Sequence, residues 1–262
     1  MTTTHNLLLN YQQLGHGEPI VLIHGLFGSL ENLNMVAKHL SQYYCVISVD
    51  VRNHGNSFHQ EGMHYPDLAQ DVIKLLNHLA IDSCHFLGHS MGGKIAMQIA
   101  LSYPEKVKKL IVADIAPVAY PAHHLIIIKG LQAIDLSKVV QRKAADNQLA
   151  TYVEDAGVRQ FLLRNITMNG QGEFYFKCNL NYIEQGYPQI MQKNEASNGQ
   201  VFNGETLFIK GANSDYILAE HQSIISTLFS NAKAKIIQGA GHWLHAEKTV
   251  AFNKIVVDFL AK

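Results

Sequence analysis

Ser90 lies at the centre of a GHSMG stretch, Gly88–Gly92, with one glycine two residues before it and another two residues after it. An apolar run precedes this stretch, and a helical pattern, Met91–Ser102, follows it. A nucleophile on a tight turn between strand and helix takes strained backbone angles, so only small residues fit at the two flanking positions. The following helix would direct its N-terminal amides and the positive end of its dipole at the site. This context, more than the bare pattern, predicts a nucleophilic serine at Ser90.

A second glycine-rich motif, His24–Gly28, follows an early apolar run. In a hydrolase, the backbone amide of Leu26, together with that of Met91, would bind the oxyanion that forms during the reaction. An ordinary glycine-rich turn between a strand and a helix is the alternative. A phosphate-binding loop is excluded because no Gly-Lys-Ser/Thr follows.

A third motif, Gly239–Trp243, places His242 just after the last expected strand. The histidine lies beyond Ser90 in the chain, in a loop that can reach the carboxyl edge of the sheet, where α/β proteins build their sites. Neither the nearby His245 nor the pair His123–His124 has a third ligand at a recognisable spacing. We therefore expect no metal site.

Six short apolar runs supply the strands that must position these motifs, and each ends in a turn followed by a helical or glycine-rich stretch. Runs that are almost wholly apolar are typical of parallel strands covered on both faces. Helical spacing between Leu68 and Leu79, with Pro66 and Asp67 at its start, and again over Val250–Leu260, indicates helices between and after them. We predict a doubly wound, mostly parallel α/β sheet. The expected strands are Pro19–Ile23, Cys45–Val49, Ser83–Leu87, Leu110–Ala113, Thr206–Ile209 and Ala234–Ile237.

Residues 117–203 interrupt this alternation. The stretch is predicted to form several helices, with one strand-like patch near Phe174, and to be inserted as a cap between two strands of a core formed by residues 1–116 and 204–262. The expected helices are His124–Ile134, Ser137–Val153, Gly157–Ile166 and Tyr175–Glu184.

The composition indicates a globular protein, with 47% apolar and 16% charged residues. Lysines plus arginines equal aspartates plus glutamates at 21 each, so neither nucleic acid nor an anionic membrane is an expected partner. No apolar run is long enough to span a membrane, and Met1–Asn10 lacks the pattern of a signal peptide. Three widely spaced cysteines fit a reducing compartment, and we expect the protein to be cytoplasmic. Its oligomeric state is left open.

Together these motifs resemble the α/β-hydrolase fold superfamily, and within it the YbfF-type esterases. The similarity also covers Asp50–Ser57, Leu30–Leu33, Asp114–Val118 and Gly211–Ser214. It implies Ser90 as nucleophile, His242 as base, and the amides of Leu26 and Met91 as oxyanion donors. It further implies that no cofactor is needed and that the substrate is a small-molecule ester or acyl thioester, acyl-CoA included. We interpret Arg52–Ser57 as structural support, with Arg52 and His54 packing the turn below the site. Phe27, Trp243 and Phe58 are candidate lining of the acyl pocket.

The acid of the triad has two candidates, since Asp114 and Asp215 each follow an expected strand and precede His242. We favour Asp114, because it directly ends an apolar strand and would enter a low-dielectric site. Asp215 lies one residue beyond the position that many relatives use, three residues after Gly211, which holds Ser214 here. The resemblance to YbfF-type esterases also favours the earlier strand.

The predicted function is that of a serine hydrolase that cleaves carboxylic esters or acyl thioesters through an acyl-enzyme. Two other classes of function stay open. One is C–C bond hydrolysis, lactone opening or a lyase step on the same fold, because a fold does not determine a substrate. The other is a ligand-binding signalling protein with slow turnover, for which a strained nucleophile turn would have no use.

Overall fold

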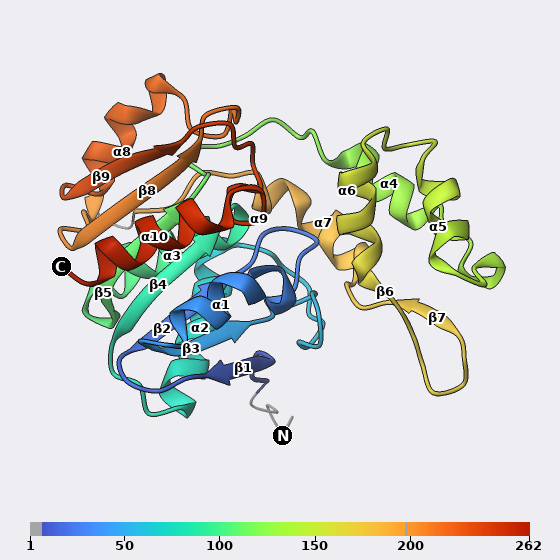
Figure 1. Cartoon of the computed structure of the whole chain (residues 1–262), viewed down its shortest axis with the longest axis horizontal. Coiled ribbons are helices and arrows are strands. Elements are labelled where there is room, and N and C mark those ends of the chain that lie inside the picture. Colours follow the sequence, from blue (N-terminus) through green and yellow to red (C-terminus); the bar gives the residue numbers. More distant parts are fainter. Residues whose placement is uncertain (1–6, 197–198) are drawn as a thin grey trace.

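A computed structural model describes residues 7–196 and 199–262 of the chain. The expectation about a signal peptide in residues 1–10 falls mostly outside the described part. Seven strands form one sheet in the order β1-β3-β2-β4-β5-β8-β9, in which every neighbouring pair is parallel except β1 and β3 (Figure 1). The predicted doubly wound, mostly parallel α/β fold is therefore confirmed. The strands are β1 Tyr11–Leu14, β2 Pro19–Ile23, β3 Cys45–Val49, β4 Cys84–His89, β5 Val107–Ala113, β8 Glu205–Gly211 and β9 Ala232–Ile237.

All six expected strands are present, and the structure adds β1 at one edge. Strand β1 pairs antiparallel with β3, and its sequence, YQQL, is mostly exposed. This strand was not predicted, because an exposed edge strand needs no apolar run. The edge position is what allows these polar residues.

Helices cover both faces of the sheet, because alternate side chains of β2 pack against helices on opposite sides. Val21 and Ile23 pack in the core on the side of α2 and α3, whereas Ile20 and Leu22 pack on the side of α1 and α10. Successive side chains of a strand point to opposite faces, so a strand covered on both faces must be apolar throughout. The helices and single turns of this part are η1 Leu30–Leu33, α1 Asn34–Leu40, α2 Tyr65–His78, α3 Met91–Ser102, η2 Pro104–Lys106, η6 Ala219–His221, α8 Gln222–Leu228, α9 Leu244–Glu247 and α10 Thr249–Leu260.

The chain between β5 and β8 forms a separate group of helices and one hairpin, which lies at one side of the sheet (Figure 1). We call residues 117–203 the inserted segment. Its buried residues, Ile128 and Ile183 among them, join the core on the α2 and α3 side of the sheet. The elements of the segment are α4 Leu125–Gln132, η3 Leu136–Lys138, α5 Arg142–Leu149, α6 Ala156–Leu162, η4 Leu163–Asn165, β6 Ile166–Met168, β7 Phe174–Phe176 and α7 Leu180–Ile190.

The helix expected over Tyr175–Glu184 is wrong at its start. Phe174–Phe176 is a strand that pairs antiparallel with Ile166–Met168, so the strand-like patch near Phe174 is real. The helix begins only at Leu180, where the side chain of Asn179 accepts a hydrogen bond from the backbone of Tyr182. An asparagine that caps a helix in this way marks its first turn. None of the helices in residues 7–196 and 199–262 has both the length and the apolar character needed to cross a bilayer.

Lys94, on α3, ties the inserted segment to the sheet. Its side chain is buried, and its ammonium donates to the carbonyl oxygens of Val118, at 2.6 Å, and Gln192, at 2.5 Å. The ammonium also lies over the rings of Tyr65 and Tyr120, 5.4 and 4.8 Å from their centroids. Val118 lies between β5 and α4, and Gln192 lies between α7 and β8. One ammonium therefore binds both stretches of chain that connect the helices of the segment to the sheet.

The buried Lys94 makes stability depend on pH. Burial lowers the pKa of Lys94 to about 7, whereas a lysine in an unfolded chain titrates near ~10.4. Between these values the unfolded state binds more protons than the folded state, so the free energy of unfolding increases with pH in that window. We expect the free energy of unfolding, measured by urea denaturation from about pH 6 to pH 9, to increase with pH above neutrality in wild type. In Lys94→Met, which lacks the titrating group, this increase should be absent. A difference between the two proteins that does not change with pH would contradict this expectation.

Candidate active site

The residues singled out in the sequence meet at the carboxyl edge of the sheet. Ser90 follows β4, Asp114 follows the neighbouring strand β5, and His242 lies in the loop after β9. The glycine-rich turn His24–Gly28 follows β2, which lies on the other side of β4. Because parallel strands end at the same edge, four segments distant in sequence converge there.

Ser90 occupies a strained turn between β4 and α3. Its backbone has φ 53° and ψ −121°, a conformation that residues other than glycine rarely adopt. The backbone amide of Ser90 donates to the carbonyl oxygen of Ala113, at 3.0 Å, which anchors the turn to β5. A Cβ on Gly88 would lie 2.1 Å from the carbonyl oxygen of Gly92, and a Cβ on Gly92 would lie 2.2 Å from that of Ile23. The sequence argument for small residues at both positions therefore has a direct steric cause.

Ser90, His242 and Asp114 form a row of hydrogen bonds, which we call the Ser–His–Asp row. Nε2 of His242 lies 3.0 Å from Oγ of Ser90, and Nδ1 of His242 lies 2.8 Å from Oδ2 of Asp114. An ionised carboxylate only accepts hydrogen bonds, so Nδ1 of His242 carries the proton and Nε2 is free to accept the one from Ser90. This is the tautomer in which the imidazole can act as a base towards Ser90.

The carboxylate of Asp114 is fully buried, at 0% exposure, and has three donors. Beside His242, Oδ1 accepts from the backbone amide of Gly211 at 3.0 Å, and Oδ2 accepts from the hydroxyl of Ser214. Asp215 is exposed to solvent. The position three residues after Gly211 thus holds a serine that supports the carboxylate from β5, and the structure brings Asp114, not Asp215, to the imidazole.

The turn after β2 holds the peptide of Leu26 in a fixed orientation. The carbonyl oxygen of Gly25 accepts from the backbone amide of Gly28, at 3.0 Å, and from Nδ1 of His24, at 2.8 Å. The amide of Leu26 belongs to the same trans peptide and therefore points the opposite way. Met91 is the first residue of α3, where backbone amides have no partner within the helix. Leu26, Ser90 and Met91 line one small cavity together.

Two buried histidines support this turn as neutral hydrogen-bond acceptors. Nε2 of His24 accepts from the amide of Val51, at 3.0 Å, and Nε2 of His54 accepts from the amide of Phe27, at 3.1 Å. Burial lowers the pKa of both imidazoles, that of His54 to about 3. Asn165 of the inserted segment donates to the carbonyl oxygen of Phe27, at 2.7 Å. The supporting role expected of His54 in the Arg52–Ser57 motif fits these contacts.

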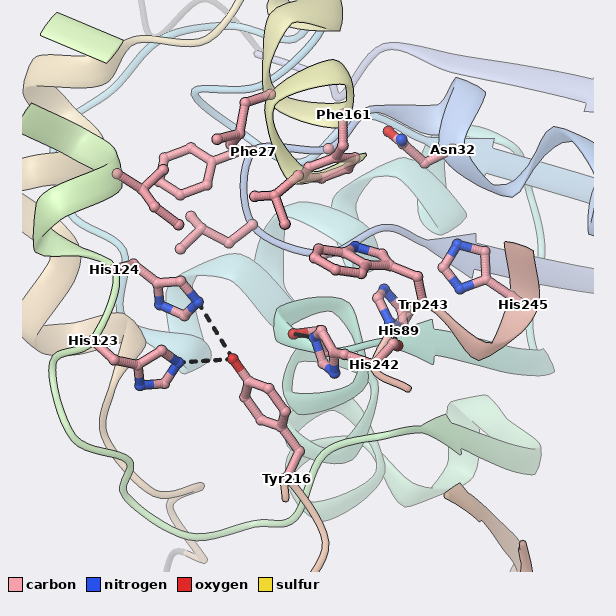
Figure 2. A pocket seen from close by; sticks show the side chains of 17 residues that line it. Phe27, Asn32, His89, His123, His124, Phe161, Tyr216, His242, Trp243 and His245 are labelled. Carbon is pink, nitrogen blue, oxygen red and sulfur yellow. Dashed lines mark hydrogen bonds between the residues drawn. The ribbon is translucent and has the colours of Figure 1, made fainter. Parts of the chain in front are cut away.

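A cavity of about 250 Å³ opens beside the Ser–His–Asp row (Figure 2). Phe27 and Trp243, two of the three expected pocket residues, line it, and the ring of Trp243 lies 5.9 Å from that of Phe161 on α6. Phe58 lies elsewhere, with its ring 5.8 Å from the guanidinium of Arg52. The apolar lining consists of Leu26, Phe27, Ile127, Val158, Phe161, Leu162 and Trp243.

Further histidines surround His242. Nε2 of His89 donates to the carbonyl oxygen of His242, at 2.8 Å, and burial keeps the pKa of His89 well below its usual value. The ring of His245 packs 4.4 Å from that of His89. Within the described residues, no three histidine, cysteine or carboxylate side chains converge as they would around a metal ion.

Sequence reasoning missed several residues that shape this site. Ser214, Asn165 and Tyr216 are examples, and Tyr216 stacks on His242. Ser214 was interpreted from the sequence only as a residue that replaces the acid found in many relatives. Its hydroxyl, next to the candidate acid Asp215, could have indicated a hydrogen-bond donor to the other candidate, Asp114. Asn165 contacts Phe27, more than a hundred positions away in the chain, and Tyr216 contacts His242, about twenty-five positions away. No local sequence pattern marks contacts of this kind.

Comparison with known proteins agrees with this geometry. Residues 18–249 match the family model of the alpha/beta hydrolase fold. The chain is 40% identical to the mouse (Mus musculus) sn-1-specific diacylglycerol lipase ABHD11 over 250 residues, covering 92% of this chain and 80% of that one. It is 36% identical to esterase YbfF of Escherichia coli over 250 residues, covering 95% of each chain. A solved structure of an esterase from a marine microorganism superposes with a TM-score of 0.93 at 38% identity, covering 97% of this chain and 99% of the other. With its fold, its strained serine turn and these relatives, the chain belongs to the α/β hydrolase fold family.

Proposed function

We propose that this protein is a serine esterase that hydrolyses small-molecule carboxylic esters through an acyl-enzyme. The observation that carries the proposal is the Ser–His–Asp row, with Ser90 on a strained turn beside the amides of Leu26 and Met91. The names of the relatives, an esterase and a diacylglycerol lipase, support the same reaction class. We assign every group that acyl transfer requires to one edge of the sheet.

In the first half of the proposed reaction, Nε2 of His242 accepts the hydroxyl proton of Ser90 as Oγ attacks the ester carbonyl. The amides of Leu26 and Met91 stabilise the oxyanion of the tetrahedral intermediate. Asp114 stays ionised and holds the imidazole in the reactive tautomer. His242 then gives the proton to the leaving alcohol, and the acyl group stays on Ser90.

In the second half, His242 accepts a proton from the water that attacks the acyl carbonyl. It then returns this proton to Oγ of Ser90 as the bond between Oγ and the acyl carbon breaks, which releases the acid and restores the free enzyme. A thioester carbonyl would meet the same groups, so acyl thioesters are included in the proposal. Lactone opening would use the same row, whereas a purely ligand-binding protein would gain nothing from a strained serine.

We further propose that the inserted segment, residues 117–203, acts as a cap over a core formed by residues 1–116 and 204–262. Ile127 of α4 and the residues Val158, Phe161 and Leu162 of α6 line the cavity opposite Trp243 and Phe27. Because these side chains are apolar, the part of the cavity lined by the inserted segment suits an acyl chain better than a charged group.

The first test concerns the nucleophile. Ser90→Ala should lower ester turnover by several orders of magnitude and leave the fold intact, because only the attacking oxygen is lost. A fluorophosphonate probe should label wild type and not the variant. Labelling that persists in folded Ser90→Ala would assign the nucleophile to another residue.

The second test compares the two carboxylates. Asp114→Asn should lower kcat by about 10⁴, because an amide at this position leaves His242 in the wrong tautomer. Asp215→Asn, at an exposed position one residue past Ser214, should cost about tenfold at most. Steady-state kinetics on an activated short-chain ester, with circular dichroism to confirm folding, measures both. The reverse order of the two effects would assign the acid to Asp215.

The third test concerns the length of the acyl chain. Each buried methylene contributes about 0.8 kcal/mol, or about fourfold in kcat/KM, so kcat/KM should rise over the first few carbons and fall once the cavity is full. Phe161→Ala enlarges the cavity and should move the optimum to longer chains. Phe174→Ala is the matched control, since Phe174 is a partly buried phenylalanine of the same segment that does not line this cavity. A steady fall from acetyl onwards would refute an apolar acyl site.

A further inference from the structure

Tyr216, in the loop after β8, covers one face of the imidazole of His242. The two rings are stacked, with centroids 4.0 Å apart and planes at 22° (Figure 2). His89 and Trp243 contact the same imidazole at wider ring distances, 4.8 and 5.9 Å. Among these aromatic neighbours, the ring of Tyr216 is therefore the one that restricts how the imidazole plane can tilt.

The hydroxyl of Tyr216 reaches the inserted segment, where it meets two histidines at the start of α4. It lies 2.8 Å from Nε2 of His123 and 3.3 Å from Nε2 of His124 (Figure 2). Nδ1 of His123 lies 2.8 Å from the carbonyl oxygen of Pro121, which can only accept, so Nδ1 carries the proton and Nε2 accepts from Tyr216.

The other half of this network joins His124 to Tyr187. Nδ1 of His124 lies 3.0 Å from the hydroxyl of Tyr187, which already accepts from the backbone amide of His124 and so donates to Nδ1. Nε2 of His124 then carries the proton and donates to the hydroxyl of Tyr216. Burial lowers the pKa of His124 to about 3, so this ring adds no positive charge near His242. In this assignment each ring nitrogen has one role, and the hydroxyls of Tyr187 and Tyr216 each accept one hydrogen bond and donate another.

The backbone of Tyr216 is fixed as well. Its amide donates to Oγ of Ser214, at 3.3 Å, and Ser214 in turn donates to Asp114. Its carbonyl oxygen accepts from the hydroxyl of Tyr120, which itself accepts from the amide of Ala116. Tyr216 is thus held at its backbone by Ser214 of the core and by Tyr120 near the start of the inserted segment, and at its hydroxyl by the two histidines that precede α4.

We propose that Tyr216 is a positioning residue for His242: its ring sets the plane of the imidazole, and its hydroxyl couples that plane to the start of α4. The inference rests on the proposed esterase function, because it assigns His242 as the base. During acyl transfer the imidazole becomes a cation, and an aromatic face stacked on a cation stabilises it. Movement of His123 away from the cavity would release the ring from its hydroxyl end.

Kinetics of two variants separate the ring from the hydroxyl. Tyr216→Leu removes both and should lower kcat about tenfold, with KM changed about twofold or less, because the lost interaction is strongest with the charged imidazole. Tyr216→Phe keeps the ring and should recover most of that loss, to within about threefold of wild type. Equal losses in the two variants, or none in either, would overturn the role of the ring.

A double-mutant cycle tests the coupling to α4. His123→Ala should lower kcat about threefold in wild type and have no further effect in Tyr216→Phe, because the hydroxyl is the only proposed connection. Equal effects in both backgrounds would overturn the coupling. Thermal denaturation of each variant confirms that a folded protein is being compared.

A spectroscopic readout keeps this test separate from the proposed function. The Nδ1 proton of His242, hydrogen-bonded to Asp114, should give a downfield proton resonance that needs no substrate. We expect this resonance to stay sharp in Tyr216→Phe and to broaden or vanish in Tyr216→Leu. A sharp resonance in folded Tyr216→Leu would overturn the positioning role. If the variants show the expected resonances but wild type does not hydrolyse esters, only the esterase function is rejected.

Discussion

The buried carboxylate of Asp114 is the constraint around which this end of the molecule is arranged. A carboxylate with no exposure to water must find all its partners within the protein, because an unpaired buried charge is very costly. The partners come from the end of β8, the loop after β8 and the loop after β9: the amide of Gly211, the hydroxyl of Ser214 and the imidazole of His242. These contacts join the ends of β5 and β8 to the loop after β9, and they hold Nδ1 of His242 towards Asp114.

The fold and the main site residues were predictable because each leaves a local mark on the sequence. Strands buried on both faces must be continuous apolar runs, and β2 and β3 begin and end where those runs do. The turn at Ser90 demands glycines at fixed positions, since a single Cβ at Gly88 or Gly92 would meet the backbone. Steric limits of this kind are written in a few neighbouring residues, so a single sequence reveals them.

The remaining features depend on contacts that no short window of sequence contains. Strand β1 is polar because it lies at an edge, and its pairing with β3 decides its structure. The carboxyl edge of a parallel sheet offered two plausible acids, and only the packing of the loop after β8 directs Ser214, not Asp215, inwards. Within the inserted segment, the hairpin of β6 and β7 competed with a helical pattern, and tertiary pairing decided the outcome. The roles assigned to Ser90, His242 and Asp114 in catalysis stay predictions.

The attachment of the inserted segment through Lys94 has a consequence for how such a protein can diversify. The two acceptors of its ammonium are main-chain carbonyl oxygens, at Val118 and Gln192, and every residue type supplies such an oxygen. The donor belongs to α3, the helix that the nucleophile turn already requires. Mutations can therefore accumulate along the segment, and alter what its cavity accepts, while the anchor that holds both of its ends is inherited unchanged with the core.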